Sequence, residues 1–356
     1  MKAAERRILL KFRKYMILSV VCVMLAACLC AVSRGAPEYR IKIGSLVTPQ
    51  SEWGKVVGKV IRKLEKQSGG RVKIEHLHSG MLGGGQSMME MVLHGGIQGA
   101  GIPSANLAAV VPEMHVLELP FLFDDYDEAY YLIDNVLEPY LRKKLEDKGL
   151  LTSAFLENGL MEFVAPRFIH RPEDLKGLKV GCWESPVHIA FWEALDANPI
   201  PIPVTEVMNA HARGIVDSGA NTFNALIAWD HLFGTAIKRE DIYITEVKYS
   251  YQAGILVMHK RTWESYPPDV RKMLMKSLSD MTLQLRKTLR EAEPKSRKEL
   301  LKRGYHVTTM PPEERGVFME KTKSVYNKFE KQVGKEFLKK VLEEREKYRE
   351  SKKKAE

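Results

Sequence analysis

Several short segments of the chain have residue types and spacing that could support chemistry. Residues 83–85 are three glycines before an apolar segment, where backbone N–H groups could bind a phosphate at a helix N-terminus. The Lys-Ser/Thr pair of a phosphate-binding loop is missing, so we do not expect phosphate binding. The acidic residues within 124–128 could attract a cation, but they lack the glycine of an EF-hand loop and stand where a helix begins. Acidic side chains in the first turn of a helix interact favourably with the helix dipole, and we adopt this interpretation.

Metal and catalytic motifs are equally weak. His76 and His78 face the same side of a strand and could share a metal ion, but no second pair stands at ligand spacing, so we expect structural histidines and no metal site. The sequence contains no Gly-x-Ser-x-Gly elbow and no His-Glu-x-x-His helix. We predict a protein that is not an enzyme and has no cofactor. The enzymatic alternative uses Glu184 as a general base.

The first 36 residues predict export. Basic residues precede an uncharged stretch from Tyr15 to Ser33, as in a signal peptide. Within it, the sequence Leu-Ala-Ala-Cys ending at Cys28 has the form of a lipobox, so Cys28 is a candidate lipid anchor. Cleavage near Gly35 and a retained membrane-spanning segment remain open alternatives. The expected location is the periplasm, with or without an N-terminal membrane tether.

The charge and the cysteines exclude other classes of protein. The net charge is +10, but residues 1–14 carry six basic side chains and one acidic one, so half of the excess belongs to the leader. We therefore expect no nucleic-acid partner. A mixed-charge helix after Lys331 accounts for much of the rest. Only Cys182 lies outside the leader, which leaves no disulfide framework in the body and makes Cys182 a core residue.

Alternating apolar residues and helical spacing define the elements that must position any site. The pattern predicts a strand at 39–43, a helix at 53–64 ended by Gly69 and Gly70, a strand at 72–74, a helix at 86–93 and a strand at 99–102. A loop that contains Ser104 follows. This βαβαβ order indicates an α/β protein with a mainly parallel sheet covered by helices on both faces.

A second cycle of elements indicates a second lobe. The sequence predicts a strand at 178–180, a helix at 187–195, a strand at 200–202 broken by prolines and a helix at 205–212. From Pro268 the pattern is helical, with Pro294 expected to interrupt it and Gly304 to end it. A chain of 356 residues also exceeds one ordinary core. The long helical region is too long to serve one lobe alone.

Motifs spread along residues 39–335 resemble the substrate-binding (P) subunits of tripartite ATP-independent periplasmic (TRAP) transporters, the DctP-like family. The resemblance rests on Pro112-Glu113, Leu119-Pro120-Phe121-Leu122-Phe123, Pro172 to Val180, Glu184-Ser185-Pro186, Ala194 to Pro199, Glu206-Val207 and Gly214-Ile215-Val216-Asp217. It implies a two-lobed periplasmic binding protein fold, with mixed sheets flanked by helices and a long helix crossing both lobes. The implied division is a leader at 1–36, lobe I at 37–157 plus 247–286, lobe II at 158–246 plus 287–318, and C-terminal helices at 319–356.

The chain departs from that family where the family holds a carboxylate. The usual arginine after the Asp-Leu-Lys-Gly-Leu-Lys-Val stretch is replaced by Gly181, and a second one after the Asn-Gly pair by Met161. An unpaired buried carboxylate loses roughly 2 to 5 kcal/mol. We therefore predict an apolar or amphipathic ligand rather than a small carboxylate. The expected ligand-binding residues are Trp53, Ser104, Asn158, Met161, Gly181, Trp183, Glu184, Met208, Asn221 and Trp229, with Trp192 also near the expected cleft.

The resemblance also implies partners. Such a protein closes on one ligand and delivers it to the small and large membrane permease subunits of a transporter driven by an ion gradient. Gly181 and Met161 make the chain similar to a branch that travels with a tetratricopeptide-repeat lipoprotein. The functional alternative is a carrier or scaffold that holds its ligand for a partner protein.

Overall fold

The computed structural model describes residues 36–355, except for the side chains of residues 153, 232–236 and 355. The predicted leader, with Cys28 and the alternative cleavage site near Gly35, lies outside this range. Within the described residues, no helix combines the length and the apolar character needed to cross a bilayer.

The first lobe is built around a five-stranded sheet with the strand order β2-β1-β3-β10-β4. β1 pairs in parallel with β2 and β3, whereas β10 is antiparallel to both β3 and β4, so the sheet is mixed. The elements are β1 (Tyr39–Ser45), α2 (Glu52–Gln67), β2 (Val72–Leu77), α3 (Gly85–Leu93), β3 (Gly99–Pro103), α4 (Ser104–Leu107), the 3-10 segment η1 (Pro112–Glu118), α5 (Tyr126–Leu132), η2 (Ile133–Leu137), α6 (Glu138–Asp147), β4 (Leu150–Leu160), β10 (Tyr251–His259) and α10 (Lys260–Ser265).

The second lobe holds a four-stranded sheet in the order β11-β9-β5-β8 and a separate parallel pair, β6 and β7. Val180 of β6 forms a bridge to Ser218, which joins the pair to the start of β8. The elements are β5 (Glu162–Ala165), η3 (Pro172–Leu175), β6 (Lys179–Cys182), α7 (Pro186–Ala194), β7 (Asn198–Pro201), α8 (Val207–Ala212), β8 (Gly219–Asn221), α9 (Phe223–Ala236), η4 (Arg239–Asp241), β9 (Tyr243–Glu246) and β11 (His306–Thr309). The mixed α/β, two-lobed prediction is confirmed, and the exact lobe boundaries stay a prediction.

The helix α2 shows how local sequence produces these elements. Ser51 caps its N-terminus by accepting a hydrogen bond from the N–H of Gly54 at 3.0 Å. Val56, Val60 and Leu64 recur at helical spacing and are buried against the sheet. Gly69 then adopts a positive φ of 65°. Glycine tolerates this left-handed conformation, which cannot continue the α-helix, so α2 ends here.

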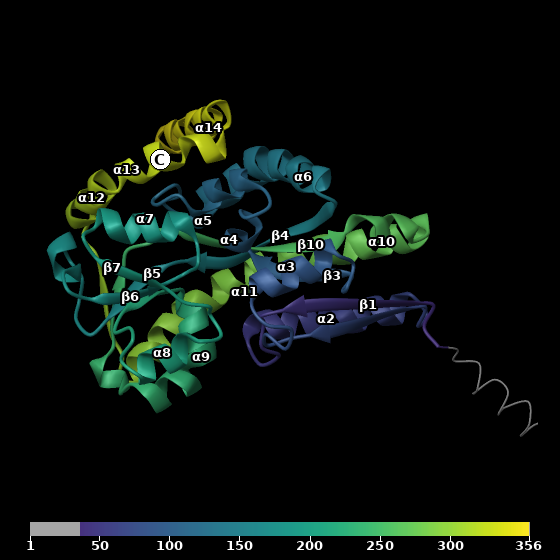
Figure 1. Cartoon of the computed structure of the whole chain (residues 1–356), viewed down its shortest axis with the longest axis horizontal. Helices are drawn as coiled ribbons and strands as arrows, with labels where there is room; N and C mark the ends of the chain where they lie inside the picture. The colour runs from purple at the N-terminus through teal and green to yellow at the C-terminus, as the bar shows by residue number, and fades with distance from the viewer. Residues whose placement is uncertain (1–35, 356) are drawn as a thin grey trace, which may run out of the picture.

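The long helix α11 (Pro268–Lys302) crosses both lobes, contacting α2 and β4 in the first and α9 and β11 in the second (Figure 1). The expected interruption at Pro294 is wrong, because the helix runs on past it and ends before Gly304. A proline removes one N–H donor without ending a helix that is held by its neighbours. Here the side chain of Asn224 on α9 donates to the carbonyl of Leu289, one turn before the proline.

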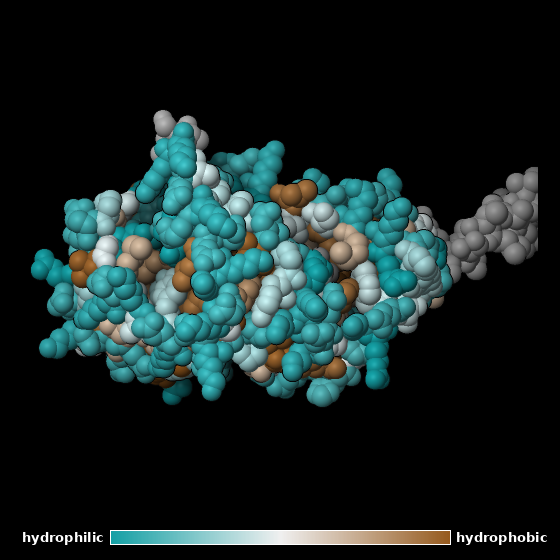
Figure 2. Space-filling view, turned by 90° about the horizontal axis from the view of Figure 1, so that it is seen from above, coloured by the Kyte–Doolittle hydropathy of each residue, from teal (hydrophilic) through white to brown (hydrophobic). Residues whose placement is uncertain are grey.

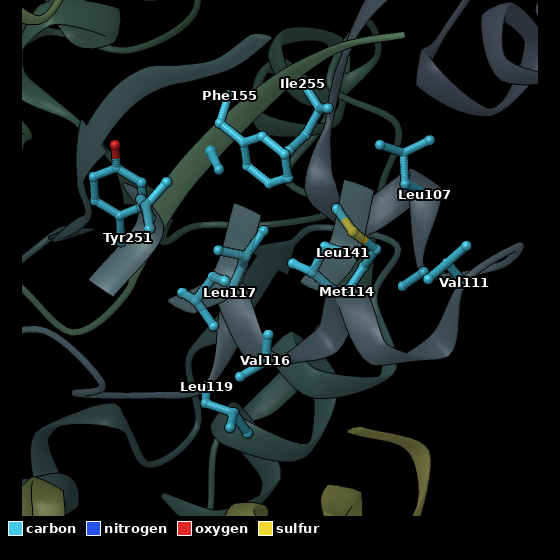
Figure 3. Close-up of a cluster of buried hydrophobic side chains, with 14 of the residues drawn as sticks. Leu107, Val111, Met114, Val116, Leu117, Leu119, Leu141, Phe155, Tyr251 and Ile255 are labelled. Carbon is cyan, nitrogen blue, oxygen red and sulfur yellow. The ribbon is translucent and has the colours of Figure 1, made fainter. Parts of the chain in front are cut away.

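The largest buried cluster lies in the first lobe, around η1. Figure 3 shows Met114 and Leu117 of η1 facing Phe155 of β4 and Ile255 of β10. Burying apolar surface of this kind is the main stabilising term in folding. The face of the molecule seen in Figure 2 is mostly hydrophilic, with apolar residues in small separated patches, as expected for a protein in contact with water.

Three C-terminal helices, α12 (Pro312–Lys321), α13 (Lys323–Val333) and α14 (Lys335–Ala355), lie along one side of both lobes (Figure 1). α13 contacts η1 and α7, and α14 contacts α5. The acidic segment at 124–128 meets them: Asp125 caps α5, as predicted for acids at a helix start, and Arg349 of α14 pairs with the buried Glu128 at 2.6 Å. The acidic residues therefore cap α5 and pair with α14, and these contacts account for them without a bound cation.

Candidate functional site

A cavity of about 400 Å³ lies between the two lobes. The first lobe contributes the loop after β1, the start of α2, the end of β3 and facing parts of β4 and β10. The second lobe contributes the residues after β6 and one face of α9. Residues from both halves of the chain line it, among them Ser45, Thr48, Trp53, Ile102, Leu156, Asn158, Trp183, Val204, Asn221, Asn224, Ile227, Trp229, Gln252, Gly254, Leu289 and Ser296.

Five of the predicted site residues meet at this cavity: Trp53, Asn158, Trp183, Asn221 and Trp229. They come from separate elements in the two lobes, so only the fold brings them together. Three indole rings around one space give a large apolar and aromatic wall.

Two further predicted residues, Gly181 and Met161, line a smaller cavity of about 60 Å³ in the second lobe. The two cavities share Trp183, Val204, Asn221 and Trp229 as lining residues, so they adjoin. Trp192 also lines the smaller cavity. The positions of the absent arginines therefore border a space next to the main cavity.

The remaining predicted residues lie elsewhere and line neither cavity. Ser104 is buried at the start of α4, which is a short helix where the sequence predicted a loop. Glu184 is exposed, and Met208 packs against the buried cluster around Phe223. These three residues are neighbours of lining residues in the sequence, but the fold places their side chains outside both cavities.

Trp53 is held in place by a hydrogen bond to the backbone of the first sheet. Its Nε1 donates to the carbonyl of Glu157 in β4 at 2.7 Å. A Cβ built on Gly254 of β10 would stand 3.8 Å from its ring, so the indole lies over a sheet position that has no side chain. The hydrogen bond and the glycine fix the ring plane at the floor of the cavity.

The polar part of the cavity wall consists mainly of neutral groups. The Nδ2 of Asn158 donates to Oε1 of Gln252, and the Oδ1 of Asn221 accepts from the N–H of Thr222 at 2.9 Å. Asn224 accepts from the hydroxyl of Ser296 at 2.9 Å. Amides held in this way can orient a polar group of a ligand without supplying a charge.

Charge is nearly absent from the lining. Of the described residues around the main cavity, the charged ones are Glu52 and Lys55, and these pair with each other at 2.5 Å on the first turns of α2. In the smaller cavity, burial lowers the pKa of His211 below its ordinary value, which favours the neutral imidazole. Neither space presents the planar, bidentate donor that an arginine gives to a carboxylate.

Sequence reasoning missed many lining residues, among them Ser45, Leu46, Val47, Thr48, Gln252 and Gly254. Ser45 ends β1 and the next three residues follow it, at the carboxyl end of a parallel strand, where ligands of open α/β sheets usually bind, so that rule could have found them. Gln252 and Gly254 belong to a strand whose place in the first sheet depends on pairing with residues about a hundred positions earlier. No local signal marks such a pairing.

A polar network lies behind the cavity, where β4 passes between the lobes. Glu157 is 1% exposed and accepts hydrogen bonds from Arg290 of α11 and from the hydroxyl of Tyr130. Arg290 also pairs with Glu293 at 2.5 Å, and Tyr126 donates to Glu293 at 3.0 Å. Full pairing of the buried Glu157 carboxylate links β4 to the long helix α11.

A second buried cluster joins η1 of the first lobe to α7 of the second. The hydroxyl of Ser185 donates to Glu118, and His188 Nε2 lies 3.8 Å from the same carboxyl. Burial raises the pKa of Glu118 to about 8 and lowers that of His188 to about 4, as it does for His115. All three side chains are therefore favoured in their neutral forms, which suits a dry contact between the lobes.

Metal ligation has little support in the part of the chain that the structure describes, where no group of three histidine, cysteine or carboxylate side chains could hold a metal ion. His76 instead shares a hydrogen bond of 2.7 Å with Ser45, and His78 one of 3.0 Å with Ser79. Their rings meet edge to face, with centroids 5.8 Å apart.

Comparison with known proteins places this arrangement in a family. A family model described as bacterial extracellular solute-binding protein, family 7 (DctP), matches residues 43–332. The 2,3-diketo-L-gulonate-binding periplasmic protein YiaO of Escherichia coli K12 is 29% identical over 247 residues, covering 69% of this chain and 74% of that protein. The C4-dicarboxylate-binding periplasmic protein DctP of Rhodobacter capsulatus is 26% identical over 302 residues, covering 84% and 88%.

Solved structures agree with the fold. A TRAP periplasmic solute binding protein from Ralstonia eutropha H16 with bound (S)-2-acetolactate has a TM-score of 0.80 at 27% identity, covering 86% of this chain and 99% of that one. The sugar acid binding protein DctPAm of Advenella mimigardefordensis, in complex with galactonate, has a TM-score of 0.81 at 25% identity, covering 86% and 98%. This chain therefore belongs to the DctP family of bacterial extracellular solute-binding proteins.

Proposed function

We propose that the protein captures an apolar or amphipathic ligand between its lobes and delivers it to the small and large permease subunits of a TRAP transporter. The observation that carries the proposal is the cavity wall. It combines three tryptophans with neutral amides, and its charged lining residues, Glu52 and Lys55, satisfy each other. Being a solute-binding protein, the chain is not an enzyme, and the exposed Glu184 needs no catalytic role.

Two physical terms support this ligand class. A carboxylate moved from water into such a space keeps no cationic partner, which costs roughly 2 to 5 kcal/mol relative to a paired one. Each methylene buried against the tryptophans contributes about 0.8 kcal/mol, so an eight-carbon chain contributes about 6 kcal/mol before the cost of association. The wall therefore favours hydrocarbon over a small acid.

The solved relatives hold acetolactate and galactonate, which are acids. We propose that this chain binds a different class of ligand. The difference is attributed to Gly181 and Met161. Met161 is 1% exposed and accepts a weak hydrogen bond from the hydroxyl of Tyr249 at 3.8 Å, so it acts as apolar packing beside the cavity. Neither residue can pair with an anion.

The proposed location is the periplasm, with Cys28 as the lipid anchor; a retained leader and cleavage near Gly35 are the alternatives. Incorporation of a labelled fatty acid that is lost in Cys28→Ala would support the anchor, and absence of label in the parent protein would refute it.

The resemblance to the branch that accompanies a tetratricopeptide-repeat lipoprotein makes such a protein a proposed second partner. Recovery from membranes of a complex with that protein but without permease subunits would favour a carrier role instead.

Tryptophan fluorescence tests the ligand class. Trp53, Trp183 and Trp229 surround the cavity, so a ligand there should change their emission. Titration with 1-octanol should give a saturable change with a Kd of about 0.1 mM or weaker, and one that is reduced in Trp183→Phe. Succinate and galactonate should give none. A saturable response to either acid, with none to the alcohol, would overturn the proposal.

A further inference from the structure

A third cavity, of about 80 Å³ and with apolar walls, lies in the first lobe beneath α2. Its walls are the sheet face of β1, β2 and β10, the inner face of α2, and the first half of α11. Most of its lining residues are aliphatic or aromatic, among them Ile41, Ile43, Val57, Val60, Leu64, Ile74, Leu256, Met258, Trp263, Leu274, Leu278 and Met281. Its polar lining residues are Ser45, His76 and Ser277.

This space separates two parts of the first-lobe core. One buried cluster contains Leu64, Ile74 and Met258, and another contains Val60 and Met281; side chains of both clusters face the cavity. Protein interiors are normally packed so closely that few voids exceed a water molecule. This cavity is partly open rather than sealed, and its apolar walls lack the packing contacts that an apolar occupant would supply.

The buried cavity adjoins the cleft. Ser45, Val47, Trp53, Gly101 and Leu156 line both spaces. Gly101 contributes no side chain to this shared wall, and a Cβ built there would come within 4 Å of one atom only, the Cβ of Ser45 at 3.8 Å. Trp53 stands at the same boundary, held by its hydrogen bond to Glu157.

The polar atoms at this boundary are already engaged. The hydroxyl of Ser45 shares a hydrogen bond of 2.7 Å with His76, and burial lowers the pKa of that imidazole, which favours its neutral form. Empty apolar cavities exclude water and accept apolar molecules instead; one of about 150 Å³ holds a benzene. By that measure, 80 Å³ has room for about three carbon atoms.

We infer that the cavity beneath α2 is a subsite for the end of a hydrocarbon tail, and that the ligand is a single-chain amphiphile with a neutral polar head. The head lies in the cleft at the amides of Asn158 and Gln252, and the tail passes Gly101 and Trp53 into the first lobe. This inference rests on the proposed function, because it needs an apolar ligand in the cleft.

A series of primary alcohols on the intact protein tests the subsite. Affinity in the parent protein should rise about fourfold for each added methylene from 1-hexanol to 1-decanol. Ser277 is 8% exposed and lines the buried cavity but not the cleft, so Ser277→Leu should fill the subsite. We expect a loss of about 60-fold for 1-decanol, the value of three methylenes, with 1-hexanol unchanged. Met275→Leu, at a half-exposed position of α11 that lines neither cavity, is the matched control.

The outcomes separate the two proposals. If no alcohol binds the parent protein, the proposed function fails and the subsite with it. If alcohols bind but Ser277→Leu keeps the parent's chain-length dependence, the subsite alone is wrong. Val57→Phe, which fills the cavity from α2, repeats the test should Ser277→Leu unfold. In crystals soaked with 10-bromo-1-decanol, the bromine should lie among Val57, Leu278 and Met281; a bromine between Trp183 and Trp229 would contradict the subsite.

Discussion

Replacing Gly181 by arginine should convert the protein into a binder of small acids. A Cβ at position 181 would meet Val216 and the carbonyl of Ser218 at 3.4 to 3.5 Å, which is ordinary contact, so the backbone need not move. The longer side chain can enter the adjoining 60 Å³ cavity and extend toward the shared wall of Trp183 and Asn221. The change introduces the arginine that the resemblance to the family implies at this position.

The expected size of the effect follows from the contact that is created. A hydrogen bond to a charged group contributes about 1.5 to 3 kcal/mol, and a bidentate guanidinium is the best case. That range corresponds to roughly 10- to 150-fold tighter binding of a carboxylate. With galactonate or succinate at about 10 to 100 times the variant's Kd, the native state gains about 1.4 to 2.7 kcal/mol, or roughly 2 to 4 °C in melting temperature.

The assay is thermal unfolding with and without each acid, for the parent protein, Gly181→Arg and Gly181→Met. Methionine fills the same cavity without a charge, so it separates the effect of bulk from that of the guanidinium. We expect a rise with acid for the arginine variant only. An arginine variant that folds normally and shows no acid-dependent shift would refute the reasoning that the missing cation sets the ligand class.

Three further predictions concern the rest of the molecule. Trp183→Ala should weaken 1-octanol binding by about 1.5 to 3 kcal/mol in a fluorescence titration, because it removes a buried aromatic wall shared by both cavities; equal affinity would remove Trp183 from the site. Glu118 has a folded pKa raised to about 8 by burial, so its stabilising contribution is complete below pH 4.5 and is lost as the pH rises through 8. Glu118→Gln should thus gain stability over the parent, by a few kcal/mol, between pH 5 and 8 in denaturant titrations; a constant difference would contradict the burial argument. Arg349→Ala should lower the free energy of unfolding by about 1 to 3 kcal/mol because it leaves Glu128, which is 2% exposed, without its cation; Lys339→Ala, at an exposed pair on the same helix, is the control and should change little.

Local patterns predicted the elements of the first lobe well. Tyr39, Ile41 and Ile43 alternate as a half-buried strand does, and the structure has β1 at Tyr39–Ser45. Ser51 and the glycine pair at 69–70 bound α2 by capping interactions that need no tertiary partner. Pro294 misled the prediction because α11 is packed against elements of both lobes and continues past the proline, and the local sequence does not reveal that packing.

The site was harder to predict because its geometry comes from pairing between distant segments. Asn158 meets Gln252 across 94 residues, and Trp53 reaches Glu157 across 104. Residue type alone identified the tryptophans as candidates but could not say which face of a helix meets the cleft. Met208 therefore entered the prediction although it packs in the core of the second lobe, while Ile227 and Ala228 of α9 line the cavity and were missed.

The ligand that the protein carries when it is isolated tests the central claim most directly. Protein purified without added ligand from cells of its own host should be extracted with organic solvent and the extract examined by mass spectrometry, with the Trp183→Ala variant treated in parallel. We predict that the extract contains a lipid-like or other amphipathic compound that is depleted in the variant. Recovery of only a dicarboxylate, a sugar acid or a neutral sugar from the parent protein would contradict it.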